Sequence, residues 1–442
     1  MTQGADDACH TIPLRVDPIA DSEGSVDPLG LAVVYERLAD LMLPGLTVRM
    51  RRPRLLTAIA VGARICRECG ADEVAKDAVT PPYLVYEWWI IQAFVAASEQ
   101  LKNITGIPGF VKTSRAWRAG RPLSAAAYLK TASVFGFTGI LRRLAVRAQI
   151  ITEGHQLDEA GHRLVKMWAD ARHLDGFYQG SSGPGAQFCA DLTKAVREGL
   201  RDGRTGDRPG SFYRQIATHL DPLRAGPRES ALLLELIENR SGLPEEVRFL
   251  TGALKRRQHA LELADEPAFM RRLTRNAPPR LKETLTAIGT YESFCKPLTD
   301  AFDWLRYLGS THGKTGITAS EYTKEAPIKE LHASLRSGID AAAADELLGK
   351  NEIWPDRALT LLRLRECKKP QDLLQFVLEH HREAQRQKPP DGKRAWIEDA
   401  RGRILVRAAY VLDAAPDPRR AYTHDYRLPT LSRFLEDLGA LA

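Results

Sequence analysis

The sequence predicts a mainly α-helical protein of several domains, with a winged-helix segment in its first half and a small β-hairpin near its end. Apolar residues recur at helical spacing through most of the chain, breaks rich in Gly, Pro and Ser separate these runs, and one late stretch alternates like a pair of strands. A chain of 442 residues is too long for one ordinary core. Its 44% hydrophobic and 27% charged residues are ordinary for a globular protein and exclude wholesale disorder.

The first 120 residues are expected to hold a leader and a helical domain. Residues 1–28 are rich in Asp, Gly and Ser and predict a flexible leader. Residues 29–120 show helical periodicity, and one predicted helix contains the aromatic run "PPYLVYEWWIIQAF" of residues 81–94. Its two prolines suit a first helical turn, and Thr80 is the expected N-cap.

Residues 121–180 have the order of predicted elements that is typical of a winged-helix domain. A helix is followed by an amphipathic helix with outward arginines, a strand-like "QII", a glycine turn and a last helix. The alternative is a plain helical subdomain with a surface hairpin.

The rest of the chain is expected to be a linker, a helical domain and a terminal region. Residues 181–211 are rich in Gly, Ser and charge and predict a linker or loop region. Residues 212–348 read as successive amphipathic helices, and residues 349–442 as a helix followed by a hairpin in "RAWIEDARGRILVRAAYV".

Several function classes lack their motifs in this sequence. There is no Walker loop, no HExxH, no GxSxG and no kinase signature, and "GSTHGKTG" (residues 309–316) lacks phosphate-loop spacing. Cys66 and Cys69 form a single CxxC without a second ligand pair nearby. We therefore expect no metal and no other cofactor. No apolar run is long enough to span a bilayer, and the sparse cysteines favour the cytoplasm.

The single carboxylate in the aromatic run is the candidate catalytic residue. Glu87 shares a helix face with apolar and aromatic residues, where a dry carboxylate is costly and its pKa should rise. One interpretation is a buried Glu paired with an arginine of "RMRRPR" (residues 49–54). The other is a carboxylate in a pocket that stabilises an oxocarbenium-like sugar or orients water. The rings expected to stack on a base there are Tyr83, Tyr86, Trp88 and Trp89.

Basic residues flank this helix in the sequence and predict contacts to a phosphate backbone, with a solvated charged face as the alternative. The net charge of +7 permits a polyanionic partner without requiring one. A further basic group with a tryptophan near the C-terminus could stack on a base, or the tryptophan could be core. The predicted DNA-binding residues are Arg49, Arg51, Arg52, Arg54, Lys112, Arg115, Lys130, Arg142, Arg143, Arg147, Lys393, Arg394 and Trp396.

Three stretches, "YEWW", "YLKTASVFGFTGILRRLA" and "LDEAGHRLVKMW", together resemble prokaryotic proteins associated with phage defence. Among characterised members, the resemblance is to antiphage DNA glycosylases that act on glucosylated hydroxymethylcytosine. It covers roughly residues 30–180. It implies a DNA partner, with modified phage DNA as one candidate, and a base-removing activity that leaves abasic sites.

Three functions follow as hypotheses. The first is a DNA glycosylase of antiviral defence with Glu87 as its carboxylate. The second is a non-enzymatic winged-helix DNA-binding sensor or adaptor. The third is a helical scaffold whose aromatic cluster is core or a protein interface.

Overall fold

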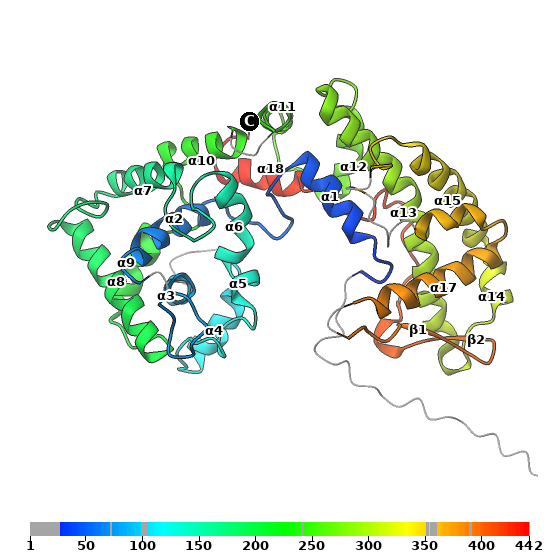
Figure 1. Cartoon of the computed structure of the whole chain (residues 1–442), viewed down its shortest axis with the longest axis horizontal. Helices are drawn as coiled ribbons and strands as arrows, with labels where there is room; N and C mark the ends of the chain where they lie inside the picture. Colours follow the sequence, from blue (N-terminus) through cyan, green and yellow to red (C-terminus); the bar gives the residue numbers. More distant parts are fainter. Residues whose placement is uncertain are drawn as a thin grey trace, which may run out of the picture. The chain divides into compact units, whose positions relative to one another are not determined.

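The computed structural model describes residues 27–70, 73–98, 105–239, 243–350, 353, 360–388 and 391–441. The fold is mainly helical, with 61% of the chain in helices and a two-stranded antiparallel hairpin near the C-terminus, as the sequence predicts (Figure 1). No helix in these ranges is long and apolar enough to cross a membrane. The predicted leader, residues 1–28, lies almost entirely outside the described residues.

The chain forms two compact units, and their boundaries differ from the predicted domains. The first unit combines residues 1–38 with 286–424, and the second combines residues 39–285 with 425–442. Both boundaries near residues 38 and 285 fall inside continuous helices, α1 (Ala32–Met42) and α13 (Pro279–His312). Sequence breaks therefore do not mark the division, because a helix that passes from one unit to the other keeps its periodicity.

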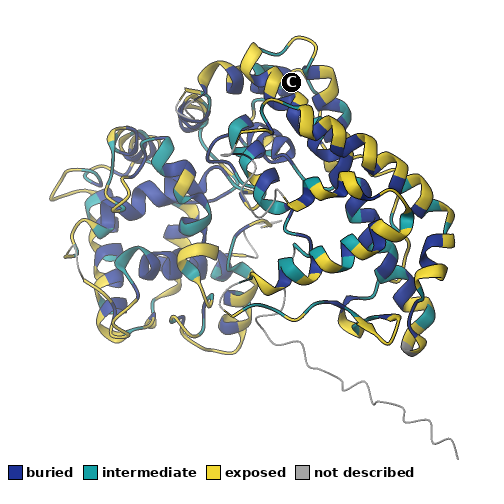
Figure 2. Cartoon of the chain, turned by 45° about the vertical axis from the view of Figure 1, so that its right-hand side comes forward, coloured by how far each residue is buried: buried dark blue, intermediate teal, exposed yellow. Residues whose placement is uncertain are grey.

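The second unit is a cluster of helices around α3 (Pro82–Ala96). Most helices have one exposed and one buried side, as expected for amphipathic helices on a core (Figure 2). The other helices of this unit are α2 (Leu55–Cys66), α4 (Phe110–Arg118), α5 (Ala132–Phe135), α6 (Phe137–Arg147), α7 (Glu159–Ala171), α8 (Pro184–Asp202), α9 (Gly210–His219), α10 (Pro227–Asn239), α11 (Pro244–Lys255), the 3-10 turn η1 (Leu263–Asp265), α12 (Glu266–Leu273) and α18 (Leu428–Asp437).

The first unit packs shorter elements against the later part of α13. They are η2 (Gly313–Thr315), α14 (Ala319–Lys324), α15 (Ala326–Ala344), η3 (Thr360–Glu366), α17 (Pro370–Arg386), β1 (Ile397–Ala400), β2 (Arg403–Val406) and η4 (Ala408–Tyr410). The hairpin turns at Arg401 and Gly402, both with positive φ, as a two-residue hairpin turn requires. A bridge between Ile317 and Ile404 fixes it to the segment after α13.

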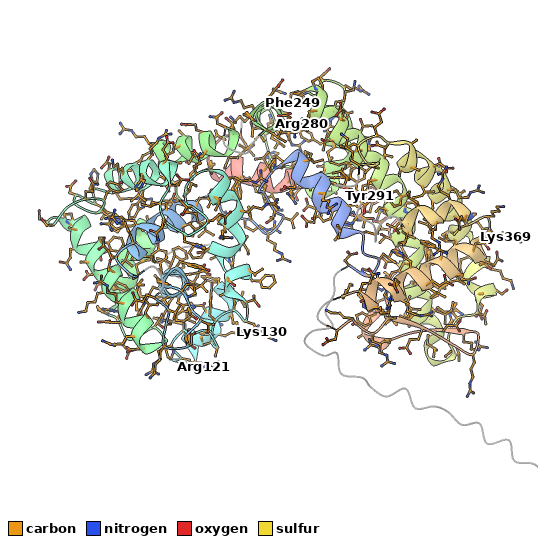
Figure 3. The ribbon with its side chains drawn as sticks, viewed as in Figure 1. Arg121, Lys130, Phe249, Arg280, Tyr291 and Lys369 are labelled. Carbon is orange, nitrogen blue, oxygen red and sulfur yellow. The ribbon has the colours of Figure 1, made fainter. Side chains whose placement is uncertain are left out.

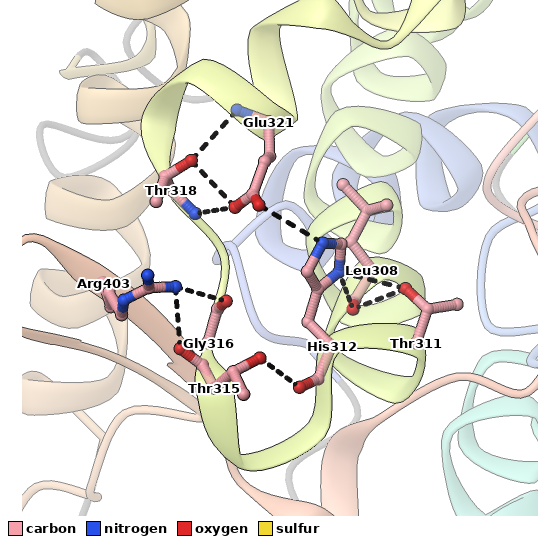
Figure 4. Close-up of polar contacts among 8 residues, drawn as sticks. All are labelled: Leu308, Thr311, His312, Thr315, Gly316, Thr318, Glu321 and Arg403. Atoms are coloured by element: carbon pink, nitrogen blue, oxygen red, sulfur yellow. Dashed lines mark hydrogen bonds and ion pairs between the residues drawn. The ribbon is translucent and has the colours of Figure 1, made fainter.

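The segment "GSTHGKTG" is occupied by structural hydrogen bonds (Figure 4). Its first residues end α13, and α14 follows with a capping box in which Thr318 and Glu321 satisfy each other's backbone N–H groups. Arg403 donates to the carbonyl of Thr315 at 3.0 Å. These contacts close the turn, in which Gly313 and Gly316 adopt positive φ.

Two predictions about local structure need correction. Residues 184–202, part of the predicted linker, form the 19-residue helix α8, because apolar side chains behind the glycine-rich start recur at helical spacing and are buried. Thr80 does not cap α3: its hydroxyl donates to Asp77 at 2.5 Å, and Pro81 is the N-cap residue.

The winged-helix expectation is not confirmed. The order α5, α6, bridge, α7 follows the predicted rhythm, but the wing is reduced to one bridge between Ile151 and Leu157.

Candidate functional site: a buried carboxylate behind an exposed basic segment

Helix α3 is the central element of the second unit. Residues 84–95 are buried around the whole circumference of the helix. It contacts α2, α4, α6, α8 and α9, and in Figure 1 it is seen nearly end-on among them. A helix that is apolar on all sides must be enclosed by others, and this enclosure places Glu87 in the interior.

The carboxylate of Glu87 is fully buried and accepts three hydrogen bonds. Its Oε1 accepts from the Tyr128 hydroxyl at 2.8 Å and from the backbone N–H of Phe137 at 3.2 Å. Its Oε2 accepts from the backbone N–H of Thr138 at 2.9 Å. Phe137 and Thr138 are the first two residues of α6, whose N-cap, Gly136, has no side chain to satisfy them. Glu87 therefore caps α6 from another helix, where a negative charge is also favoured by the helix dipole.

Burial dominates the proton equilibrium of this carboxyl. Desolvation raises the pKa of Glu87 to about 7, although its hydrogen bonds with Thr138, Tyr128 and Phe137 stabilise the charged form and oppose the rise. The pKa of Glu87 is therefore raised, as the sequence predicts. The carboxylate is not paired with an arginine, because its hydrogen-bond donors are a tyrosine hydroxyl and the N-terminus of α6.

Gly136 lets the helix approach the acid closely. A Cβ at this position would lie 2.0 Å from Oε1 of Glu87 and 2.6 Å from the carbonyl oxygen of Ala132. Real Cβ atoms do not approach other atoms this closely, so the capping arrangement depends on glycine at position 136.

The four predicted stacking rings occupy different environments, and three are core. Tyr86, Trp88 and Trp89 are at most 1% exposed. The Tyr86 hydroxyl donates to the carbonyl of Ala58 at 3.0 Å, and the Trp89 indole donates to that of Ala195 at 3.0 Å.

Tyr83 is less buried than these three and lies at the start of α3. It stacks on His155 with ring centroids 3.9 Å apart. The aromatic run thus forms packing contacts around α3, and the structure does not bring its four rings together around the carboxylate of Glu87.

The segment that donates to Glu87 has an unusual charge composition. Residues 100–152 contain no Asp or Glu. We call the described part, residues 105–152, the acid-free segment; it comprises α4, α5, α6 and their connections and carries eight Lys or Arg residues. The buried Glu87 holds this segment through Tyr128 and the start of α6.

The side chains of five cationic residues in the acid-free segment form no hydrogen bond or ion pair with any other residue in the described ranges. They are Lys112, Arg115, Arg118, Arg121 and Lys130, and all five are exposed. The first three lie at i, i+3 and i+6 on the outer side of α4. Figure 3 shows Arg121 and Lys130 near one edge of the unit.

Exposed apolar side chains accompany these cations. Of the seven large hydrophobic residues that the described chain exposes, four lie in the acid-free segment: Val111, Trp117, Val134 and Phe135. The Arg49 guanidinium lies 4.9 Å from the Phe135 ring centroid, a cation–π geometry. The segment therefore presents positive charge and ring surface together.

The remaining predicted arginines of this unit divide by their partners. Arg51 is exposed and lines a pocket beside Gly106. Arg54 is 4% exposed and pairs with Glu229 at 2.9 Å, so it serves the core. The paired surface arginines are Arg52 with Asp437, Arg142 with Glu153, and Arg143 and Arg147 with Asp40.

The C-terminal group lies in the first unit and is largely structural. Trp396 is 6% exposed and stacks on Tyr410 with centroids 4.4 Å apart, so it is core. Arg394 pairs with Glu398 at 2.6 Å, and Lys393 also has interactions with other groups.

The sequence also places Arg118 and Arg121, as basic residues after the Glu87 helix, among the possible phosphate contacts, but sequence reasoning did not single out Trp117. The signal that was overlooked is the run of more than fifty residues without an acid, which leaves its cations without local partners.

No group of three or more metal-ligating side chains occurs within the described ranges. Comparison with protein families, curated proteins and solved structures finds no match to this chain.

Proposed function

We propose that this protein binds nucleic acid through the acid-free segment, with unpaired, single-stranded DNA as its partner. The observation that carries the proposal is the set of five exposed, unpaired cations beside exposed aromatic rings on α4, α5 and their connection. Lys and Arg that lack carboxylate partners can replace the counterions of phosphates, and the release of those counterions drives binding.

The distribution of charge between the two units supports a polyanionic partner for the second. The second unit has 39 Lys and Arg against 29 Asp and Glu, whereas the first has 24 against 27. The whole-chain excess of +7 thus hides a unit that is clearly basic. Such a field attracts polyanions and speeds their association.

The rings favour single strands over duplexes. Trp117 is 38% exposed and Phe135 is 44% exposed, and unpaired bases can stack on such rings. Duplex recognition through α6, as in a winged helix, has less support, because Arg142, Arg143 and Arg147 are already neutralised by Glu153 and Asp40.

Base excision at Glu87 gains no support from the geometry. A catalytic carboxylate must reach the sugar, whereas Glu87 is fully buried and its two oxygens are occupied by α6 and Tyr128. Glycosylase activity, modified phage DNA and a role in antiviral defence remain predictions that rest on the resemblance.

Fluorescence anisotropy of a labelled DNA strand of about 20 nucleotides, titrated at several salt concentrations, tests the proposal. For single strands, the slope of log K against log salt is about −0.7 for each phosphate contact. The triple variant K112A/R115A/R118A should lower the affinity and make the slope shallower by about 2.

A matched control removes the same charge elsewhere in the second unit. Arg228, Arg271 and Arg275 are exposed, lack ion pairs within the described ranges and lie outside the acid-free segment. R228A/R271A/R275A should leave the slope nearly unchanged. Equal losses in both variants would mean that the net charge, and not the segment, attracts DNA. No binding by the wild-type protein at low salt would refute the proposal.

A further inference from the structure

A pocket of about 500 Å³ lies at the C-terminal end of α4, within the second unit and beside residues 117–122 of the acid-free segment. Its lining includes Gln92 of α3, Trp117 of α4, Arg121, Arg204 of the loop after α8, and Tyr213 of α9. This volume lies within the range of about 300–1,000 Å³ that is typical of small-molecule sites.

Gln92 has an unsatisfied amide in this lining. Its side chain is 6% exposed, and its Oε1 is buried without a hydrogen-bond partner among the described residues. A buried acceptor without a partner is costly, whereas a carboxamide offers both donors and an acceptor to a ligand edge. No residue of the described ranges satisfies this acceptor, and Gln92 lines the pocket, so a bound molecule lies next to its amide.

The aromatic residues form a corner beside this amide. The ring centroids of Trp117 and Tyr213 are 5.3 Å apart with planes at 83°, so the two rings meet edge to face. Tyr213 is 5% exposed and fixed in place, whereas Trp117 is 38% exposed and leaves ring surface available. A planar heterocycle can stack on the exposed part of Trp117 with its edge towards Gln92.

Positive charge dominates the unpaired groups at the rim. Arg121 and Arg204 are exposed and form no ion pair within the described ranges, and Asp207 is the one acid of the lining that is also unpaired there. The fourth and fifth charged groups, Arg208 and Asp202, are neutralised by Glu198 and Arg201 outside the proposed contacts. Two free guanidinium groups at the mouth suit a phosphate.

The rim is held by hydrogen bonds and does not need to form on binding. The backbone N–H of Thr205 donates to the carbonyl of Leu123 at 2.8 Å, and the N–H of Leu123 donates to the Thr205 hydroxyl at 2.9 Å. Thr205 is 1% exposed. The loop after α8 is thereby joined to the connection between α4 and α5, which gives the pocket two fixed walls.

We infer that this pocket binds one unpaired nucleotide of the strand, with its base stacked on Trp117 and hydrogen-bonded to Gln92 and its phosphate between Arg121 and Arg204. The inference rests on the proposed function for the origin of the ligand, since Trp117 and Arg121 belong to the acid-free segment. It assigns to Gln92 the contact with the base edge and to the two arginines the contact with phosphate.

Calorimetric titration of the full-length protein with the four deoxynucleoside 5′-monophosphates, and with inorganic phosphate, tests this inference. At least one nucleotide should bind ten-fold or more tightly than phosphate. Gln92→Leu removes the amide at nearly constant volume and should weaken that nucleotide about 10- to 100-fold, as expected for a lost base-edge contact. Trp117→Ala should weaken it by a similar factor.

Gln149→Leu provides the matched control. Gln149 is a second glutamine of this unit whose Oε1 lacks a partner among the described residues, and it does not line the pocket. This variant should bind the nucleotide as the wild type does. Gln92→Leu should also unfold at the same denaturant concentration as the wild type or a higher one, which separates lost binding from lost folding.

The outcomes distinguish this inference from the proposed function. Salt-dependent strand binding with no nucleotide preferred over phosphate would overturn the pocket and leave the function standing. Nucleotide binding that Gln92→Leu and Trp117→Ala do not weaken would also overturn it. Nucleotide binding that both variants abolish, without any strand binding, would support the pocket and refute the proposed function.

Discussion

Replacement of Glu87 by Gln should change how the stability of the protein depends on pH. The pKa of this carboxyl is raised by burial to about 7, against 4.5 for the same group in an unfolded chain. Between pH 4.5 and 7, the folded protein therefore keeps a proton that the unfolded chain has released. The contribution of this proton to the free energy of unfolding is fully present below pH 4.5 and is lost as the pH rises through about 7.

The magnitude follows from the width of this window. Each pH unit changes the free energy of unfolding by about 1.4 kcal/mol for one proton, so the whole window is worth about 3 kcal/mol. Gln resembles the protonated acid in shape and does not titrate. The variant E87Q should therefore become more stable relative to the wild type by about 3 kcal/mol between pH 4.5 and 7, and the difference should then stay constant.

Urea unfolding of both proteins across pH 4 to 8, followed by tryptophan fluorescence, measures this difference. Trp88 and Trp89 follow Glu87 directly in α3, so the signal reports on the same helix. The comparison also cancels groups common to both proteins, such as His155 and His381, whose pKa values burial lowers to about 4. Parallel stability profiles for the two proteins would show that Glu87 keeps an ordinary pKa and would refute the reasoning.

Two further substitutions test the same interior. Gly136→Ala places a Cβ 2.0 Å from Oε1 of Glu87 and should lower the free energy of unfolding by about 1–3 kcal/mol. The control is Gly210→Ala, whose Cβ meets no atom within 4 Å and which should have little effect in the same denaturation assay. Arg54→Ala leaves the buried Glu229 without its ion-pair partner and should lower the free energy of unfolding by about 3–5 kcal/mol. A variant that unfolds as the wild type does but binds DNA more weakly would contradict the structural role given to Arg54.

The sequence was informative about local structure because local structure depends on near neighbours. The periodicity of apolar residues predicted a mainly helical chain, and the glycine turn between two alternating runs predicted the hairpin, whose turn is Arg401 and Gly402. The same approach failed for α8, where glycines at the start of the helix concealed buried side chains further along it.

The candidate site was less predictable because its contacts join distant residues. The sequence showed that Glu87 is a carboxylate on an apolar helix face, but its hydrogen-bond donors, Tyr128, Phe137 and Thr138, lie 41–51 residues away. Phe137 and Thr138 donate through their backbone N–H groups, which any residue type except proline would offer. The pairing of Arg143 with Asp40, over a hundred residues apart, was equally hidden.

By itself, the sequence determined that the chain is mostly helical, that one apolar helix carries an acid that must be buried, and that residues 100–152 have cations without local acids. Only the tertiary structure decided which group satisfies that acid and which cations stay unpaired. The physical reason is that charge and hydrogen-bonding capacity belong to each residue, whereas the partner that neutralises a charge is chosen by the packing of helices that are remote in the chain.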